Sequence, residues 1–379
     1  MKCLGFFRSS TIPFKNPTFS PVKIAVLGSR GIPNRYGGFE EMAERVAPLW
    51  VRAGHEVVVY ATSDHPEKVE FHEGVRVKHI FNPEHTIGLA GQFIYDYLCI
   101  LDARKEDFDI YLQLGYTTSA IWSFLWPKSK TAINMDGIEH RRAKYRGVLS
   151  VFLRWSERIG VRRSKLLVAD NPMIAEYLTK YSTSCTTIAY GAEVVEQSDA
   201  SALKKMNLPH TDYVLHIGRI QPDNHIKEIL EAAKQSGKVL ITIGDYTNRY
   251  GRQLQKRFKD CSSIYFPGTV YDKNILNELR LNCDAYLHGH SAGGTNPALL
   301  EAMGCGAFIL AHNNPFNAST LGGLGALWSD HNELSDLLRN LPNQEFKSKQ
   351  RELSRNRIRA SFNWEDIATQ YLDAFNKIK

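Results

Sequence analysis

The chain has 379 residues, of which 43% are hydrophobic, and it carries a formal net charge of +7. This length accommodates two domains of about 150 to 200 residues each, and the composition is that of a globular protein. The moderate positive charge favours a phosphate ligand or an anionic membrane surface as partner. A dedicated nucleic-acid binder is expected to be more strongly basic, so we expect no nucleic-acid partner.

Residues 1–21 precede the first predicted strand. Their apolar patch, residues 3–7, ends at Arg8 and is too short for the core of a signal peptide, so we expect a disordered tail. The six cysteines form no Cys-x-x-Cys pair, and no stretch has the roughly 18 uninterrupted apolar residues that span a bilayer. These features predict a cytoplasmic protein with reduced thiols.

From Lys23 onward, β-rich apolar runs alternate with runs of helical period, which is typical of parallel sheets covered by helices. In the helix predicted over residues 39–50, apolar side chains lie on one face, and Glu40, Glu41 and Glu44 lie on the other. We interpret this apolar stripe as core packing. The strands of the first series are predicted near residues 23–29, 56–62, 76–81, 110–115, 131–135, 166–169 and 186–190.

A second series follows the polar stretch 196–209, which we interpret as a linker. The two series predict two doubly wound domains, residues 22–195 and 210–361, with a ligand crevice at the carboxyl ends of their strands. The closing segment, 362–379, is predicted to be an amphipathic helix. The second-series strands are predicted near residues 213–217, 239–244, 263–266, 285–288 and 307–311, and the helices near 226–236, 249–259, 273–282, 297–303 and 332–341.

The segment 293–306 has the composition of an anion-binding helix start directly after a strand. Asn296 suits the N-cap, Pro297 suits the first helical position, and Gly293 and Gly294 leave the preceding backbone bare. Free N–H groups and the positive helix end would then meet the oxygens of a diphosphate. An ordinary capped core helix behind a glycine turn is the alternative.

The loop after the first strand, residues 28–40, is glycine-rich. It matches neither the Gly-x-Gly-x-x-Gly fingerprint of dinucleotide-binding proteins nor a P-loop, which disfavours a dehydrogenase. Gly37 and Gly38 precede the helix at 39–50 and would let a diphosphate or a sugar approach its start. A long flexible loop is the alternative.

Separate motifs resemble those of family 4 glycosyltransferases of the GT-B fold. Gly-Ser-Arg-Gly-Ile-Pro at 28–33, Tyr-Gly-Gly-Phe-Glu at 36–40 and the segment 134–142 are similar to the bacterial rhamnosyltransferase-like subgroup, whose members make capsular and other surface polysaccharides. The segment 293–306 is similar to the nucleotide-sugar site. The resemblance implies two Rossmann-like α/β domains facing a cleft. The first would bind the acceptor, the second would bind the nucleotide sugar, and the final helix would cross back to the first.

The resemblance also implies roles for single residues. Arg219 and a cation six residues later would neutralise the donor diphosphate; that second position is His225 here, with Lys227 two residues on. Glu301 matches the glutamate that holds the ribose, whereas the first glutamate of the family's Glu-x7-Glu motif is replaced by Gly293. The remaining residues of the expected donor site are Gly37, Gly38, Gly294, Thr295 and Asn296.

The acceptor side is expected around Asp136, directly after the strand near 131–135. At the mouth of a cleft, a carboxylate could orient the acceptor hydroxyl or take the proton that it loses as the glycosidic bond forms. Glu139 and His140 are neighbouring candidates. Alternatively, Asp136 caps the turn through Gly137.

No paired-carboxylate motif for a divalent ion follows a predicted strand. We therefore expect no metal and no other cofactor, with Arg219 and a helix start supplying the positive charge. The stretch 141–165 is rich in arginine and lysine around the apolar residues 148–152 and Trp155. It predicts either contact with anionic lipid or a solvated helix whose apolar side lies in the core.

The sequence thus predicts a metal-independent glycosyltransferase that moves a sugar from a nucleoside diphosphate to a glycan or lipid-linked acceptor. The resemblance implies retention of the anomeric configuration, favours L-rhamnose as the sugar, and places the reaction in surface polysaccharide biosynthesis at the inner face of the membrane. Two alternatives stay open. A GT-B sugar-nucleotide epimerase or hydrolase would turn over the donor without an acceptor, and a non-catalytic sugar-nucleotide-binding protein would bind without turnover.

Overall fold

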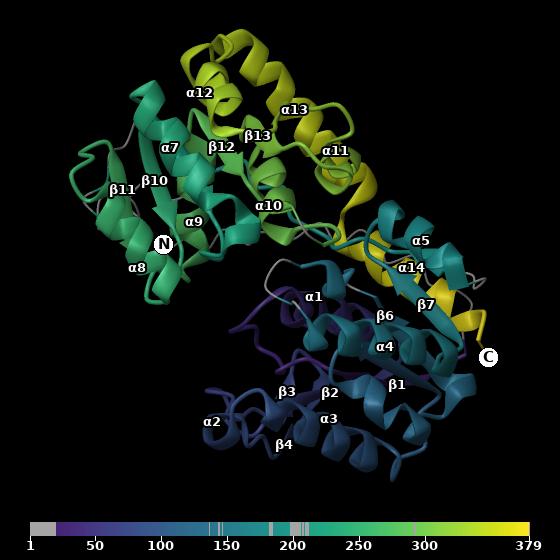
Figure 1. Cartoon of the computed structure of the whole chain (residues 1–379). Helices are drawn as coiled ribbons and strands as arrows, with labels where there is room; N and C mark the ends of the chain where they lie inside the picture. The colour runs from purple at the N-terminus through teal and green to yellow at the C-terminus, as the bar shows by residue number, and fades with distance from the viewer. Residues whose placement is uncertain are drawn as a thin grey trace, which may run out of the picture.

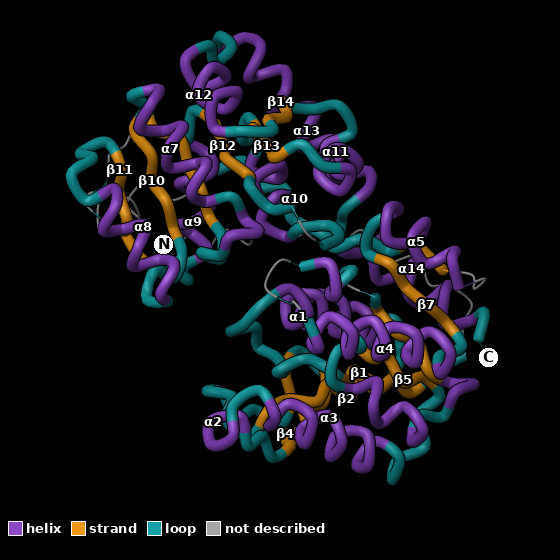
Figure 2. The backbone as a smooth tube through the Cα atoms, viewed as in Figure 1, coloured by secondary structure: helices purple, strands orange, loops and turns teal. Residues whose placement is uncertain are grey.

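Two parallel β-sheets, each covered by helices on both faces, make up the computed structural model (Figure 1, Figure 2). The eight-stranded sheet has the order β3-β4-β2-β1-β5-β6-β7-β8, and the six-stranded sheet has the order β11-β10-β9-β12-β13-β14. This confirms the predicted pair of doubly wound sheets. The structure describes residues 20–135, 137–142, 145, 147–181, 185–197, 206, 208, 212–291 and 293–378.

The first sheet is parallel except for the short antiparallel pair β3–β4. Strand β1 alternates its side chains between two cores, as a pleated strand buried on both faces must. Ile24 and Val26 belong to one core, and Ala25 and Leu27 to the other. The strands are β1 (Lys23–Leu27), β2 (Glu56–Thr62), β3 (Phe71–His72), β4 (Val75–Ile80), β5 (Ile110–Leu114), β6 (Thr131–Asn134), β7 (Leu166–Ala169) and β8 (Cys185–Thr187).

Helices on the first sheet divide between its two faces. Helix α1 shares a core with the C-terminal helix α14, whereas α3 packs against the opposite side of β1 and β2. The helices are α1 (Gly38–Arg52), α2 (Glu84–Ile87), α3 (Ala90–Ala103), α4 (Val148–Arg163) and α5 (Pro172–Leu178), with 3-10 turns η1 (Ser119–Leu125), η2 (Lys128–Lys130), η3 (Glu139–Arg141) and η4 (Thr179–Tyr181).

In the second sheet, side-chain caps mark most helix starts, because Asn and Asp at the N-cap accept a hydrogen bond from the first turn. The strands are β9 (Tyr213–Ile217), β10 (Val239–Ile243), β11 (Ile264–Gly268), β12 (Ala285–His288), β13 (Ile309–His312) and β14 (Ala326–Trp328). The helices are η5 (Pro222–Asn224), α7 (Ile226–Ser236), α8 (Arg249–Phe258), α9 (Lys273–Asn282), α10 (Pro297–Cys305), α11 (Pro315–Leu321), α12 (His331–Arg339) and α13 (Gln344–Ser361).

The last helix, α14 (Trp364–Asn376), returns to the first sheet, as predicted. Trp50 of α1 lies between α14 side chains, with ring centroids 5.8 Å from Tyr371 and 5.5 Å from Phe375. The Trp50 indole N–H donates to the carbonyl oxygen of Ala368 at 3.0 Å. Helix α14 therefore fastens the carboxyl-terminal part of the chain to the first sheet.

Two expectations about local structure need correction. Strands β3 and β14 are absent from the prediction, because two and three residues are too few for a periodic signal. Glu40, expected on the solvent face of α1, is only 4% exposed, since its carboxylate accepts a hydrogen bond from the Arg30 N–H at 2.7 Å. Among the described residues, no helix has the length and apolar character to cross a bilayer. The predicted tail and linker lie largely outside the described ranges.

Candidate functional site

A cavity of about 930 Å³ lies between the two sheets, at the carboxyl ends of their strands. The order of strands reverses between β1 and β5 in the first sheet and between β9 and β12 in the second. Such switch points leave a crevice into which the flanking loops open. Gly28 and Gly115 line the cavity from the first switch point, and Gly218 and Gly289 line it from the second. The position of the cavity therefore follows from the two strand orders.

The starts of α1 and α10 face each other across this cavity. Both Gly37 and Gly38 line it, and a Cβ atom at Gly38 would lie 3.4 Å from Pro297 Cγ. Tyr190, which follows β8, would be 3.7 Å from the same Cβ. These are ordinary contact distances, so the packing of the two helix starts does not require glycine at position 38. The sequence prediction that the glycine pair admits a ligand stays a prediction.

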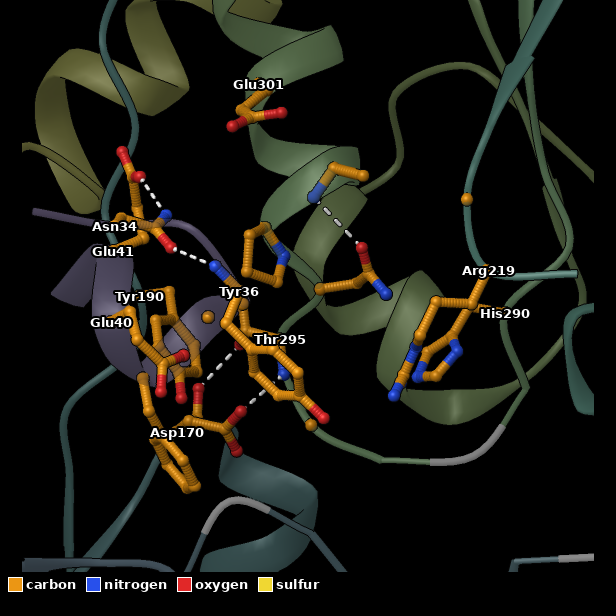
Figure 3. Close-up of a pocket in the computed structure, with 18 of the residues that line it drawn as sticks. Asn34, Tyr36, Glu40, Glu41, Asp170, Tyr190, Arg219, His290, Thr295 and Glu301 are labelled. Atoms are coloured by element: carbon orange, nitrogen blue, oxygen red, sulfur yellow. Dashed lines mark hydrogen bonds between the residues drawn. The ribbon is translucent and has the colours of Figure 1, made fainter. Parts of the chain in front are cut away.

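The predicted cap of α10 is present, but its surroundings differ from the expectation. The Asn296 side chain accepts from the Ala298 N–H at 2.9 Å, and Pro297 occupies the first turn. The Thr295 N–H donates at 3.0 Å to Oδ2 of Asp170, which follows β7, and the Thr295 hydroxyl donates to the Asp170 carbonyl (Figure 3). Thr295 N–H is therefore occupied by a carboxylate from the first sheet, where we expect a phosphate.

Gly294 lies at the closest point of this contact. A Cβ atom at Gly294 would be 1.8 Å from Asp170 Oδ1, so any larger residue would push the carboxylate away. Leu299 and Leu300 donate their N–H groups to the Asn296 carbonyl, at 3.1 and 3.2 Å. What α10 offers a ligand in this arrangement is chiefly its positive dipole, together with the side chain of Asn296.

Arg219 follows β9, is exposed and lines the cavity. Within the described residues, no carboxylate forms an ion pair with its guanidinium, and in this Arg219 differs from the other cations of the lining. Figure 3 shows it beside His290, on the side of the pocket away from Glu40 and Glu41. The other lining cations each pair with a carboxylate: Arg30 with Glu84, Arg35 with Glu67, Arg45 and Lys273 with Glu41, Arg142 with Glu139, and Arg280 with Glu301.

His225 and Lys227, the expected second cation, lie outside the cavity lining. His225 has a left-handed backbone with φ of 47°, its Nδ1 lies 2.8 Å from the Gly289 carbonyl oxygen, and its ring stacks on His312 at 3.9 Å. These contacts turn the ring toward β13. Lys227 is exposed in the first turn of α7. The structure thus separates both residues from Arg219.

Glu301 lines the cavity from α10, where the buried Arg280 of α9 forms an ion pair with its carboxylate. Gly293, at the position of the missing glutamate, has a φ of 119°, which side chains of L-residues rarely allow. A Cβ there would lie 3.2 Å from an Arg142 guanidinium nitrogen and 3.3 Å from His290 Nε2. Backbone conformation and two basic neighbours explain why glycine occupies this position.

On the acceptor side, Asp136 lies outside the described residues. Glu139 lines the cavity and pairs with Arg142, Nε to Oε1, at 2.8 Å. His140 instead points into the domain, where its Nδ1 lies 3.2 Å from Oε2 of the buried Glu157. Burial lowers the pKa of His140, against the opposing effect of Glu157. The structure therefore keeps Glu139 at the site and separates His140 from it.

Two buried carboxyl groups line the first-sheet wall of the cavity, and sequence reasoning misses both. Asp96 of α3 accepts a hydrogen bond from the Thr118 hydroxyl at 2.6 Å, and burial raises its pKa to about 7. Burial also raises the pKa of Glu40, against the N–H of Arg30. An acidic residue inside the apolar run of α3 is the signal that could have revealed Asp96. Within the described residues, no three His, Cys, Asp or Glu side chains gather as a metal site requires.

Comparisons with families of known proteins divide the chain in two. Residues 22–193 match a family described as a domain of unknown function (DUF1972), and residues 200–359 match the family described as glycosyl transferases group 1. Protein CapJ of Staphylococcus aureus is 27% identical over 161 residues, which cover 40% of this chain and 41% of that protein. The chain spans about two fifths of the length of the curated relatives it matches.

Solved structures resemble almost the whole chain. Sucrose-phosphate synthase (tll1590) from Thermosynechococcus elongatus gives a TM-score of 0.78 at 17% identity, covering 94% of this chain and 99% of that one. Anabaena Alr3699/HepE, solved in complex with UDP and glucose, gives 0.72 at 17% identity, covering 94% and 100%. The expected GT-B fold is thereby confirmed.

Proposed function

We propose that this protein is a glycosyltransferase that uses a nucleoside-diphosphate sugar. The observation that carries the proposal is Arg219, a cation without a carboxylate partner in the described residues, at the switch point of the sheet whose residues match the group 1 family. The UDP and glucose complex of the HepE neighbour supports a donor of this chemical class. The GT-B fold provides the cleft in which donor and acceptor meet.

In the proposed reaction, the bond between the sugar and the diphosphate breaks while the acceptor hydroxyl attacks the same carbon. Negative charge develops on the departing diphosphate, and Arg219 with the dipole of α10 stabilises it. Glu301, fixed by Arg280, would hold the ribose hydroxyls. Retention of configuration, implied by the motif resemblance, would have the departing phosphate take the acceptor proton on the same face.

The carboxylate of Asp170 limits where the diphosphate can bind. It occupies the Thr295 N–H, and a phosphate at the same place would repel it. The donor therefore either lies beside Asn296 and Arg219 or displaces Asp170 as it binds. Replacing Asp170 with alanine removes this repulsion in both cases, and donor affinity should rise most if the carboxylate has to be displaced.

The acceptor is proposed to bind against the first-sheet wall. Asp96 and Glu40 are buried carboxyl groups that line the cavity, and each suits a hydrogen bond to a sugar hydroxyl. Glu139, with its guanidinium partner Arg142, lines the same wall. Asp136 stays a candidate for orienting the acceptor hydroxyl.

The donor sugar and the biological context rest on motifs rather than on contacts. The segments 28–40 and 134–142 resemble rhamnosyltransferase-like enzymes of surface polysaccharide biosynthesis, so dTDP-rhamnose is the first donor to test. The lipid-linked acceptor comes from the same resemblance, and the metal-independent reaction from the absence of a paired-carboxylate motif after a predicted strand.

A thermal-shift screen of dTDP-, UDP- and GDP-sugars tests the proposal, because a specific ligand raises the melting temperature with its concentration. We expect one donor to stabilise the wild type and Arg219→Ala to abolish that shift. Turnover with a glycan acceptor then establishes transfer. Donor breakdown without an acceptor would indicate a hydrolase or epimerase, and binding without turnover on any acceptor would indicate a non-catalytic protein.

A further inference from the structure

Helices α3 and α4 both cover the first sheet (Figure 1). Exposed apolar side chains gather on and beside these two helices. Val148 is 87% exposed, Leu89 is 76% and Val151 is 69%. Helix α4 buries Leu153 and Val161, as one of the two sequence interpretations expects, but Val148 and Val151 lie outside this buried side. This surface, named here the α3–α4 patch, consists of Leu89, Ile94, Phe124, Val148, Leu149, Val151 and Trp155.

Ring contacts join the parts of the patch. Phe152 lies 5.9 Å from Phe93 of α3 and 5.8 Å from Trp155 of α4, measured between ring centroids. The indole N–H of Trp122 in η1 donates to the Phe93 carbonyl at 2.8 Å, and its ring lies 6.4 Å from Phe124. The exposed residues therefore form one surface over three elements.

The charge of α4 is one-sided. Its acidic residue, Glu157, is 1% exposed and accepts hydrogen bonds from Tyr177 at 2.9 Å and Lys180 at 3.0 Å. These bonds fix the orientation of α4, so its outward side carries Val148, Val151 and Trp155 in line with arginines. The exposed arginines of α4 are Arg154, Arg158, Arg162 and Arg163.

We propose that the α3–α4 patch docks this protein on the surface of a bilayer containing anionic phospholipid. Apolar side chains would enter the boundary between headgroups and acyl chains, and the arginines would pair with lipid phosphates. A second copy fits less well, because an isologous contact through this face would bring the arginines of both molecules together. The surface does not depend on the proposed sugar transfer.

The patch adjoins the cavity through shared elements. On α3, Gln92 and Asp96 line the cavity, whereas Ile94 and the N-cap residue Leu89 belong to the patch. On the proposed function, a lipid-linked acceptor could therefore keep its tail in the bilayer while its sugar reaches Asp96. The binding of a lipid-linked acceptor in this way requires both membrane docking and the proposed sugar transfer. Membrane docking itself does not require the sugar transfer.

Vesicle flotation tests the docking with phosphatidylcholine alone and with phosphatidylglycerol added. We expect wild type to float with the anionic vesicles at low salt and to be released as salt screens the arginines. The combined variant Arg154→Gln, Arg158→Gln, Arg162→Gln should lower the ratio of bound to free protein by about fivefold for each cation, hence roughly 100-fold. Replacing Val148, Val151 and Trp155 with serine should lower it about tenfold or more.

Matched controls lie on the second sheet. The charge control makes the same change in net charge at or beside α8 and combines Arg249→Gln, Lys256→Gln and Lys259→Gln. The apolar control removes exposed apolar residues of α13 and combines Phe346→Ser and Leu353→Ser. The proposal would be overturned if the control variants lost vesicle binding as strongly as the patch variants. It would also be overturned if the wild type bound vesicles with phosphatidylglycerol no better than vesicles of phosphatidylcholine alone. Concentration-dependent dimers that the patch variants abolish would assign this face to a second copy. Donor-induced thermal shifts should be equal in all variants.

Discussion

The two walls of the cavity differ in the charged groups that they present. The wall from the second sheet presents Arg219, without a carboxylate partner in the described residues, and the start of α10. The wall from the first sheet presents the buried carboxyl groups Glu40 and Asp96, and its arginines are neutralised by ion pairs. A cation without a partner attracts an anion, whereas a buried carboxyl group binds hydroxyls. On the proposed function, this difference favours diphosphate binding at the second-sheet wall and binding of sugar hydroxyls at the first-sheet wall.

The largest expected effect concerns the second-sheet wall, which carries Arg219. Arg219→Ala should lower kcat by about 100- to 1000-fold, since removing one donor to a developing oxyanion costs roughly 3 to 4 kcal/mol. Because Arg219 is exposed, the melting temperature should stay the same. Arg249→Ala, at an exposed position in α8, is the control. Steady-state kinetics that show equal rates for both variants would remove Arg219 from the mechanism.

The pH dependence of stability tests the role of Asp96 in the first-sheet wall. Its folded pKa is raised from 3.8 to about 7, so the folded state binds more protons than the unfolded state between these values. The free energy of unfolding should therefore fall as pH rises through this window, by an amount on the order of a few kcal/mol. Asp96→Asn should lack this fall and should weaken acceptor binding. Urea unfolding from pH 4 to 8 measures the free energy of unfolding of both proteins. If it changed with pH equally in the wild type and in Asp96→Asn, the raised pKa of Asp96 would be contradicted.

A substitution at Gly294 tests the contact between Asp170 of the first-sheet wall and the backbone before α10. Gly294→Ala would place a methyl group 1.8 Å from Asp170 Oδ1, so we expect a loss of about 1 to 2 kcal/mol in unfolding free energy. Gly38→Ala is the matched control, because its Cβ would meet ordinary contact at 3.4 Å from Pro297. Adding Asp170→Ala should restore part of the stability. A double variant no more stable than Gly294→Ala alone would show that the loss has another cause.

The smallest expected effect is that of metal removal. If Arg219 and the α10 dipole supply the charge that a divalent ion supplies elsewhere, treatment with EDTA should leave turnover unchanged. Initial rates before and after chelation measure this. Loss of turnover that magnesium restores would show that the positive charges of the second-sheet wall do not suffice.

Most strands and most helices of the second sheet are predictable because their signal is local, although α11 and α13 are missing from the prediction. Apolar runs of β1 and β9 and the Asn296-Pro297 start of α10 each encode their structure within a few residues. For the stretch that contains α4, a helix is one of two sequence interpretations. Helix α3 is not predicted, because buried and exposed apolar side chains alternate along it without a clean polar face. The same feature conceals Asp96 and the α3–α4 patch.

The sequence by itself determined the paired α/β sheets, the capped start of α10 and the position of Arg219 after a strand, since local propensity and spacing decide these. Only the tertiary structure decided that Asp170 occupies the Thr295 N–H, that His225 turns toward β13, and that Glu40 is buried. Each depends on residues far apart in the chain that meet only when the two sheets pack, and no local pattern records which partner a side chain will find.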